Sequence, residues 1–463
     1  MTAGVELAFD CDALHYSEPS ILLQFATRLG HAGIFLLMAD FAEDKPPRLP
    51  LEILEYIISC ISDRKTCLTC ALVCRFFVRP SRRRAFRRLK RRGLDSVRKM
   101  SALLESPHCT FAQEIHWFSL NQIMLSDGGV TPLDCLQRLP NLATLRVERM
   151  TSAQCQLYLM GPLMLSLPHC SHLTNLTLDY VGFLSFDMFV MVLAALPRLQ
   201  SLSCKSLSLH GVRNVPWPKE SGALKNLRFL GCEPTRAYDW RVFLEGMLAC
   251  PYRPPVEHLE LKLPWPEAGI CGRVCDFING LSPTLKYMRI NPGFAQYVPE
   301  EYSTLDFSRF KHLRSLTVEP TMHISDWFVR EQGDRLLDLL LRGLDAPHMQ
   351  KVAFLVIVND SDPPNDSRHP PENPRHPSED SRHPSDDSCQ PNAPTKWAEL
   401  DDRIAHLPNF QEMKFVLSLC SASMQMRGEH HAITDWLRGM LPEANAKGIL
   451  RFRLVNNVVP QLS

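Results

Sequence analysis

"LPNLATLRV", residues 139–147, shows the pattern that decides the fold: its apolar residues follow the order apolar-x-x-apolar-x-apolar. Phrases of this kind start roughly 26–31 residues apart through most of the chain. Besides 139–147 they are FAQEIHWF (111–118, a weaker copy), CSHLTNLTL (170–178), LPRLQSLSC (196–204), LKNLRFLGC (224–232), PPVEHLEL (254–261), SPTLKYMRI (282–290), FKHLRSLTV (310–318), APHMQKVAF (346–354) and LPNFQEMKF (407–415). Self-similarity at such a period is typical of stacked supersecondary units.

The end of each phrase has the polarity of a strand with one buried face. Leu145 and Val147, like Leu259 and Leu261, lie two residues apart, so they share one side of a strand. Segments with helical periodicity lie between phrases, at 186–196, 240–250 and 333–344. Strand and helix at constant period predict an α/β solenoid of parallel strands, because a single repeat cannot bury its own apolar face. An ordinary α/β domain would need these phrases to arise by chance.

The array resembles irregular leucine-rich repeats that lack the asparagine ladder. That resemblance implies a concave surface formed by the strands, which would bind a target protein. The residues that alternate with the buried ones are then Thr144, Arg146, Asn175, Thr177, Ser201, Ser203, His258, Glu260, Tyr287, Arg289, Ser315 and Thr317. The target-binding residues predicted from them are Arg146, Thr177, Glu260, Tyr287, Arg289 and Thr317. A target bound by terminal loops or by an insert is the open alternative.

A second pattern, LPLEILEYIISCISDRKTCLTCALVCRFFVRPSRRRAFRRL, occupies residues 49–89. Apolar residues at spacings of three and four predict a helix from about Pro50. Ser62-Asp63 predicts the cap of a second helix running to Phe77, which Pro80-Ser81 would end. A third, basic helix would follow and carry Phe86 and Leu89. Three short helices form a very small core, so a stabilising partner or neighbouring domain is expected.

This stretch resembles the F-box, most closely that of fungal proteins, through its Leu-Pro pair, Glu52-Ile53-Leu54, the Val-Cys-Arg-Phe-Phe element at 73–77 and Phe86. The resemblance implies docking onto the Skp adaptor of a cullin–RING ubiquitin ligase and, through it, onto the cullin and RING subunits. By position, the adaptor contacts would be Leu49, Pro50, Ile53, Leu54, Ile57, Leu72, Val73, Cys74, Phe76 and Phe77. The chain would be the substrate receptor of this SCF ligase, with no catalytic residue of its own.

Two other functions remain open. A scaffold could engage the adaptor without delivering a target for degradation. Alternatively, the basic segment 79–92 could bind nucleic acid or chromatin, or direct nuclear import, although no aromatic platform is interleaved with its arginines. The overall net charge of +1 argues against a globally steered nucleic-acid binder. Cys67 and Cys70 form a C-x-x-C pair at helical spacing, but no second pair follows at zinc spacing, so packing is predicted.

Composition completes the organisation. Residues 359–395 contain no Ile, Leu, Val, Met or aromatic residue and repeat Arg-His-Pro three times, which predicts a disordered insert. The predicted segments are 1–46 (unassigned extension), 47–92 (F-box), 93–358 (solenoid), 359–395 (insert) and 396–463 (last repeats and cap). Scattered cysteines and no secretory signal predict an intracellular protein, cytoplasmic or nuclear, with reduced and mostly buried thiols. No metal, cofactor or membrane association is expected, and 21–41 is too short and polar to span a bilayer.

Overall fold

The computed structural model describes residues 51–61, 63–73, 75–122, 133–150, 165–211, 217, 224–263, 270–291, 305–319, 321–322, 330–358, 395–419 and 426–456. The predicted extension 1–46, the Leu49-Pro50 pair and the insert up to residue 394 lie outside these ranges. Thr395, predicted as the last insert residue, instead begins a helix.

The strands of the described chain form one parallel sheet in the order β1-β2-β3-β4-β5-β6-β7-β8-β9-β11-β12-β13, with β10 paired to β11. The strands are β1 (Arg88–Arg92), β2 (Trp117–Asn121), β3 (Thr144–Met150), β4 (Asn175–Phe183), β5 (Ser201–Leu209), β6 (Phe229–Pro234), β7 (His258–Lys262), β8 (Tyr287–Asn291), β9 (Ser315–Val318), β10 (Thr321–Met322), β11 (Lys351–Val358), β12 (Glu412–Leu419) and β13 (Leu450–Asn456). Each sequence phrase ends inside one strand, so the parallel solenoid is confirmed.

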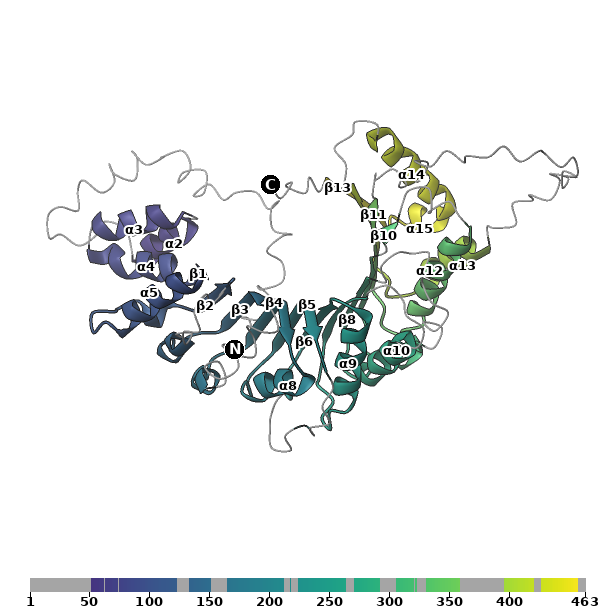
Figure 1. The fold of residues 1–463 in the computed structure, drawn as a ribbon. Helices are drawn as coiled ribbons and strands as arrows, with labels where there is room; N and C mark the ends of the chain where they lie inside the picture. Colours follow the sequence, from purple (N-terminus) through teal and green to yellow (C-terminus); the bar gives the residue numbers. More distant parts are fainter. Residues whose placement is uncertain are drawn as a thin grey trace, which may run out of the picture.

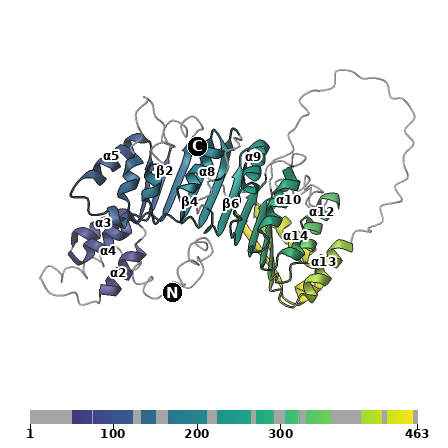
Figure 2. The ribbon, with the colours of Figure 1, turned by 90° about the horizontal axis from the view of Figure 1, so that it is seen from below.

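The helices lie on the outer side of this curved sheet, and the strands line the inner, concave side (Figure 1). Figure 2 shows the strands side by side in a single row. The helices between strands are α5 (Leu94–Glu105), α8 (Phe186–Ala194), α9 (Ala237–Leu248), α10 (Ile270–Leu281), α12 (Arg330–Gly343), α13 (Thr395–His406), α14 (Met426–Met440) and α15 (Pro442–Ala446). Short 3-10 helices, η3 (Ala112–Glu114), η4 (Leu133–Arg138), η6 (Leu167–His169) and η9 (Phe307–Arg309), replace or precede helices elsewhere.

One continuous core runs between the strands and the helices. Leu145, Leu176, Leu202 and Leu230 occupy the same register position on successive strands and are all buried. The cysteines of the described chain are free thiols, buried or half-buried, as predicted. Burial raises the pKa of the Cys170 thiol to about 11, which keeps it neutral. The array is therefore held by stacked aliphatic side chains rather than by cross-links.

A repeated backbone contact explains the phrase itself. The carbonyl of Ala143 accepts hydrogen bonds from the N–H groups of Thr174 and Asn175, at 3.0 Å each. The carbonyl of Thr174 accepts in the same way from residues 200 and 201, and the contact recurs at every later step up to Gln350. The turn before each strand is thus tied to the same turn of the next repeat, which fixes the register.

Three helices, α2 (Leu51–Cys60), α3 (Arg64–Val73) and α4 (Arg75–Phe86), cover the β1 end of the sheet (Figure 1). The predicted cap at Asp63 is confirmed, since its carboxylate accepts from the Thr66 N–H and hydroxyl at 2.7 Å each. Phe86 stacks on Phe111 with ring centroids 4.4 Å apart, so the end of α4 packs against the first repeat.

Two predictions for this region are wrong. The second helix ends at Val73, and α4 continues through Pro80, which is buried. A helix interior tolerates proline at the loss of one hydrogen bond when tertiary packing compensates. The basic segment 79–92 is not one helix, because Arg88–Arg92 forms β1 inside the range predicted for the F-box. Leu89 points inward and its neighbours Arg88 and Lys90 outward, a period of two that the run of charges concealed.

Within the described residues, no helix combines the length and apolar character that a bilayer crossing requires.

Candidate functional site

The register places the predicted target-binding residues on the concave side of the sheet, which we name the strand face. Arg146 pairs with Thr177, and Glu260 pairs with Arg289, which in turn pairs with Thr317. Tyr287 lies one outward position earlier on β8. The row containing these positions, the central row, comprises Lys90, Ser119, Arg146, Thr177, Ser203, Gly231, Glu260, Arg289, Thr317, Ala353, Lys414 and Arg451.

Arg146 belongs to an ion-pair cluster that the sequence did not reveal. Its guanidinium lies 2.7 Å from Glu148 on its own strand and 2.7 Å from Asp179 on the next strand. Lys90 approaches the other Glu148 oxygen at 3.4 Å, and the Asn121 amide donates to that oxygen as well. Glu148 occupies the outward position two residues after Arg146, so period-two spacing and opposite charge were the available signal.

Buried charge in this cluster is compensated. Glu148 is only 7% exposed. Burial raises the pKa of its carboxyl, but the charges of Arg146 and Lys90 and the hydrogen bonds to that carboxyl outweigh burial and hold the pKa below its ordinary value. Glu148 therefore stays ionised near neutral pH, and Arg146 acts first as its partner. A target that uses Arg146 would share it with two carboxylates.

Arg289 forms the second cluster of the strand face. Its guanidinium lies 2.5 Å from Glu319 and 3.7 Å from Glu260. Burial lowers the pKa of Arg289, but the hydrogen bond and charge of Glu319, supported by Glu260, raise it overall. Glu319 is 8% exposed and lies directly after β9. Arg289 thus neutralises a nearly buried carboxylate, a role that strand alternation alone did not predict.

Aromatic rings lie on the outer row that precedes the central row. His258 and Tyr287 stack with centroids 4.3 Å apart and planes 13° apart. Tyr287 is 40% exposed, so its ring is accessible from the concave side. Burial, with a smaller contribution from Lys286, lowers the pKa of His258 despite the opposing charge of Glu257, so the imidazole is neutral near pH 7. The guanidinium of Arg88 on β1 lies 4.9 Å from the ring centroid of Trp117 on β2.

The structure describes the side chains of only some of the predicted adaptor contacts. Leu49, Pro50 and Cys74 lie outside the described residues, as do the side chains of Leu54 and Val73. Ile53 and Leu72 are exposed, Leu72 to 87%. Tyr56 and Leu68 are exposed as well, although the family pattern does not mark them. Ile57 and Phe76 are half-buried.

Phe77 is buried, unlike the exposed Ile53 and Leu72. It is 4% exposed and belongs to the small core of the helices, together with Ile58 and Ala85. A side chain already enclosed by its own domain offers little surface to a partner, so the structure gives Phe77 a core position, and its role as an adaptor contact stays a prediction.

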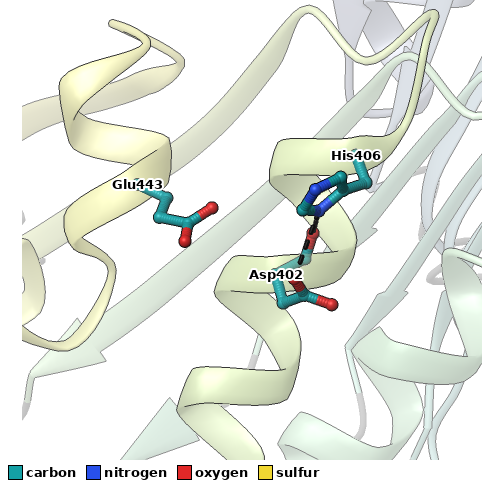
Figure 3. Close-up of side chains that lie close together, drawn as sticks. All are labelled: Asp402, His406 and Glu443. Carbon is teal, nitrogen blue, oxygen red and sulfur yellow. Dashed lines mark hydrogen bonds and ion pairs between the residues drawn. The ribbon is translucent and has the colours of Figure 1, made fainter.

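One cluster has the residue types of a metal site. Asp402 and His406 on α13 and Glu443 on α15 bring their ligand atoms within 4.8 Å of one another (Figure 3). All three are exposed, and Nδ1 of His406 lies 2.7 Å from the Asp402 carbonyl and 3.2 Å from its carboxylate. The imidazole is thus already engaged by its own helix, as in a surface ion pair.

Comparisons with known proteins support no closer assignment. A search of solved structures found similarity to the leucine-rich repeat-containing protein LegL7 from Legionella pneumophila, with a TM-score of 0.35 and 14% sequence identity. The alignment covers 73% of this chain and 88% of that one. The sequence matches no protein-family model, and a search of curated proteins found no match. The fold assignment therefore depends on the strand order and register described above.

Proposed function

We propose that this chain is the substrate receptor of an SCF-type ubiquitin ligase. Helices α2–α4 would bind the Skp adaptor, and the strand face would bind a target protein. The mechanism is proximity: holding the target near a charged conjugating enzyme raises the effective concentration of a target lysine. Catalysis would belong to other subunits, and this chain would contribute rigid spacing.

The observation that carries the proposal is the exposed apolar surface of α2 and α3. Ile53 and Tyr56 on α2 and Leu68 and Leu72 on α3 expose large apolar side chains in a unit of three short helices. Large apolar side chains exposed on so small a unit are typical of a surface that a protein partner covers. They are also the helices that carry the sequence resemblance to the F-box.

The basic segment supports this role better than nucleic-acid binding. Arg84 donates to the Ile61 carbonyl at 3.0 Å, and Arg82 donates to the Thr110 hydroxyl at 2.7 Å. Arg64 lies 5.2 Å from the Phe86 ring centroid. Two arginines of the segment, Arg82 and Arg84, thus join the helices to one another and to the first repeat.

The test is co-purification of the adaptor with variants of the full chain. Leu72→Glu places a charge on the exposed patch and should abolish adaptor recovery, as should the double variant Leu49→Ala/Pro50→Ala. Leu103→Glu, at an exposed leucine of α5, is the matched control and should leave recovery unchanged. Undiminished adaptor binding by both Leu72→Glu and Leu49→Ala/Pro50→Ala, with circular dichroism unchanged, would sink the assignment.

A further inference from the structure

The last three strands of the path present a different strand face from the rest of the sheet. Lys351, Lys414, Arg451 and Arg453 all point outward from β11, β12 and β13, and we name this group the terminal basic patch. Lys414 and Arg451 are direct neighbours across the β12–β13 pair. Lys351, Arg451 and Arg453 are exposed and Lys414 is half-buried.

The cations of this patch are uncompensated, whereas on β3–β9 three outward cations are paired and, among the described residues, Lys205 stands alone without an ion pair. Arg146, Lys262 and Arg289 each have a carboxylate partner on the strand face. In the part of the chain that the structure describes, the four cations of the terminal basic patch take part in no ion pair. Glu412, the acidic residue on this part of the face, is opposite Lys351 in the register without reaching ion-pair distance. Four cations against one carboxylate leave a local excess of positive charge.

Apolar side chains lie beside these cations. Leu355 on β11 and Val416 on β12 are register partners, and Arg453 is the next residue along the same row. Ala353 lies beside Lys414. All three apolar residues are half-buried on the outward side. The corresponding positions of β3–β8 hold Glu148, Asp179, Lys205, Glu233, Lys262 and Asn291, so this combination of apolar surface and free cations is confined to the end of the sheet.

We propose that the terminal basic patch binds a segment of a partner protein that is rich in Asp and Glu and carries Leu or Val side chains. Its carboxylates would pair with Lys351, Lys414 and Arg451, and its apolar groups would cover Leu355 and Val416. Charge complementarity selects the segment and speeds its association, while the apolar contact provides burial. This inference rests on the proposed function, because it names the part of the strand face, and the kind of target segment, that recognition uses.

Two observations favour an acidic protein segment over nucleic acid. Single-stranded nucleic acid is bound by cations interleaved with aromatic side chains on which the bases stack. The outward positions of β11–β13 at this patch hold Ala353, Leu355 and Val416 instead of aromatic residues. Branched aliphatic surface suits Leu and Val side chains of a peptide.

The experiment measures fluorescence anisotropy of a short labelled peptide rich in Asp and Glu with interspersed Leu and Val. We expect the full chain to bind it, and Lys414→Glu/Arg451→Glu to weaken binding by about tenfold or more at low salt. Leu355→Gln/Val416→Gln should weaken binding as well, with a smaller dependence on salt. The charge-matched control is Lys99→Glu/Arg198→Glu, at exposed cations outside the patch, and should bind like the parent.

Four results would overturn the proposal. Equal binding of a peptide in which Asn and Gln replace every Asp and Glu would remove the electrostatic basis. Stronger patch-dependent binding of oligo(dT) than of the peptide would assign the patch to nucleic acid. Unchanged peptide binding by Lys414→Glu/Arg451→Glu would show that the patch does not bind the peptide. Its cations would then serve only to protect the edge strand β13 from aggregation. Tighter peptide binding after residues 360–394 are replaced by a glycine linker would make that segment, with eight acidic and three basic residues, the occupant. Adaptor recovery by the parent chain is measured in parallel, and a parent chain that recovers no adaptor, which would refute the proposed function, is distinguishable from all four results.

Discussion

Replacing Arg289 by methionine should destabilise the solenoid, because the substitution leaves the nearly buried carboxylate of Glu319 without its charged partner. Arg289 lies 2.5 Å from Glu319 and 3.7 Å from Glu260. A hydrogen bond between charged groups contributes about 1.5–3 kcal/mol. The Arg289 side chain is 47% exposed, so solvent screening reduces this contribution, and we expect a loss of about 1–2 kcal/mol.

Urea unfolding followed by circular dichroism measures the loss, and a double-mutant cycle assigns it. Glu319→Gln removes the charge that needs compensation, so Arg289→Met should cost little in that background, giving a coupling of about 1 kcal/mol. Arg314→Met, at an exposed arginine just before β9, should change stability by less than about 0.5 kcal/mol. Equal midpoints for Arg289→Met and the parent protein would refute the structural role of Arg289.

The same cycle separates folding from binding. Charge reversal at Arg146 or Arg289 would place a new carboxylate beside existing ones. A loss of target recovery could then come either from destabilised folding or from a lost target contact. Arg289→Met/Glu319→Gln removes the guanidinium without leaving Glu319 charged. Loss of target recovery by this double variant, with normal unfolding, would identify Arg289 as a direct target contact.

Three further predictions concern Asp401 in the last repeats, Glu148 on β3 and the insert. Asp401→Ala should destabilise the last repeats by about 2–4 kcal/mol, because the buried Asp401 carboxylate accepts hydrogen bonds from the N–H groups of Glu443 and Ala444, at 2.9 and 2.8 Å, at the start of α15. Hydrogen exchange should become faster in α13–α15 alone, and a uniform increase over the whole chain would contradict the prediction. Because the pKa of Glu148 is lowered by folding, its contribution to stability is complete above its unfolded pKa, about 4.3, and is lost as pH falls through the lower pKa of the folded state. Glu148→Gln should therefore flatten the acid side of a plot of unfolding free energy against pH, and an unchanged slope would count against the ion pairs. Joining Val358 to Thr395 through a short glycine linker should keep the Tm within a few degrees in differential scanning calorimetry, since loop closure depends weakly on length, and a large fall would show that the insert is structural.

Sequence patterns predicted the solenoid well because each repeat is specified locally. An apolar-x-x-apolar-x-apolar phrase fixes a turn, a strand and the side that it buries, and Leu145 or Leu259 needs no distant information to point inward. β1 and β13 were missed because arginine occupies their outward positions, at Arg88 and Arg451, where charge obscures strand alternation. Pro80 predicts a helix end that packing overrides, so the break falls after Val73 instead.

The candidate site was predictable only as a face. Alternation showed that Arg146 and Arg289 point outward, but not that each serves a carboxylate. Those partners lie about 30 residues away, at Asp179 and Glu319, so cross-strand register was needed to join them. The terminal basic patch likewise depends on register, since β11 and β12 are separated by the insert and α13. Exposure of Tyr56 and burial of Phe77 depend on how three helices pack, which periodicity does not determine.

The strictly sequential strand order fixes the distance between the two ends of the sheet. From β1 to β13 the path makes eleven steps between neighbouring strands, each of about 4.8 Å, so the helices α2–α4 and the terminal basic patch are separated by roughly 50 Å along the arc. Because each repeat contacts only its neighbours, removing one would shorten that separation by a single step and leave the other contacts in place. The number of repeats therefore sets the distance between the two ends. A flexible linker of equal mass would not fix that distance.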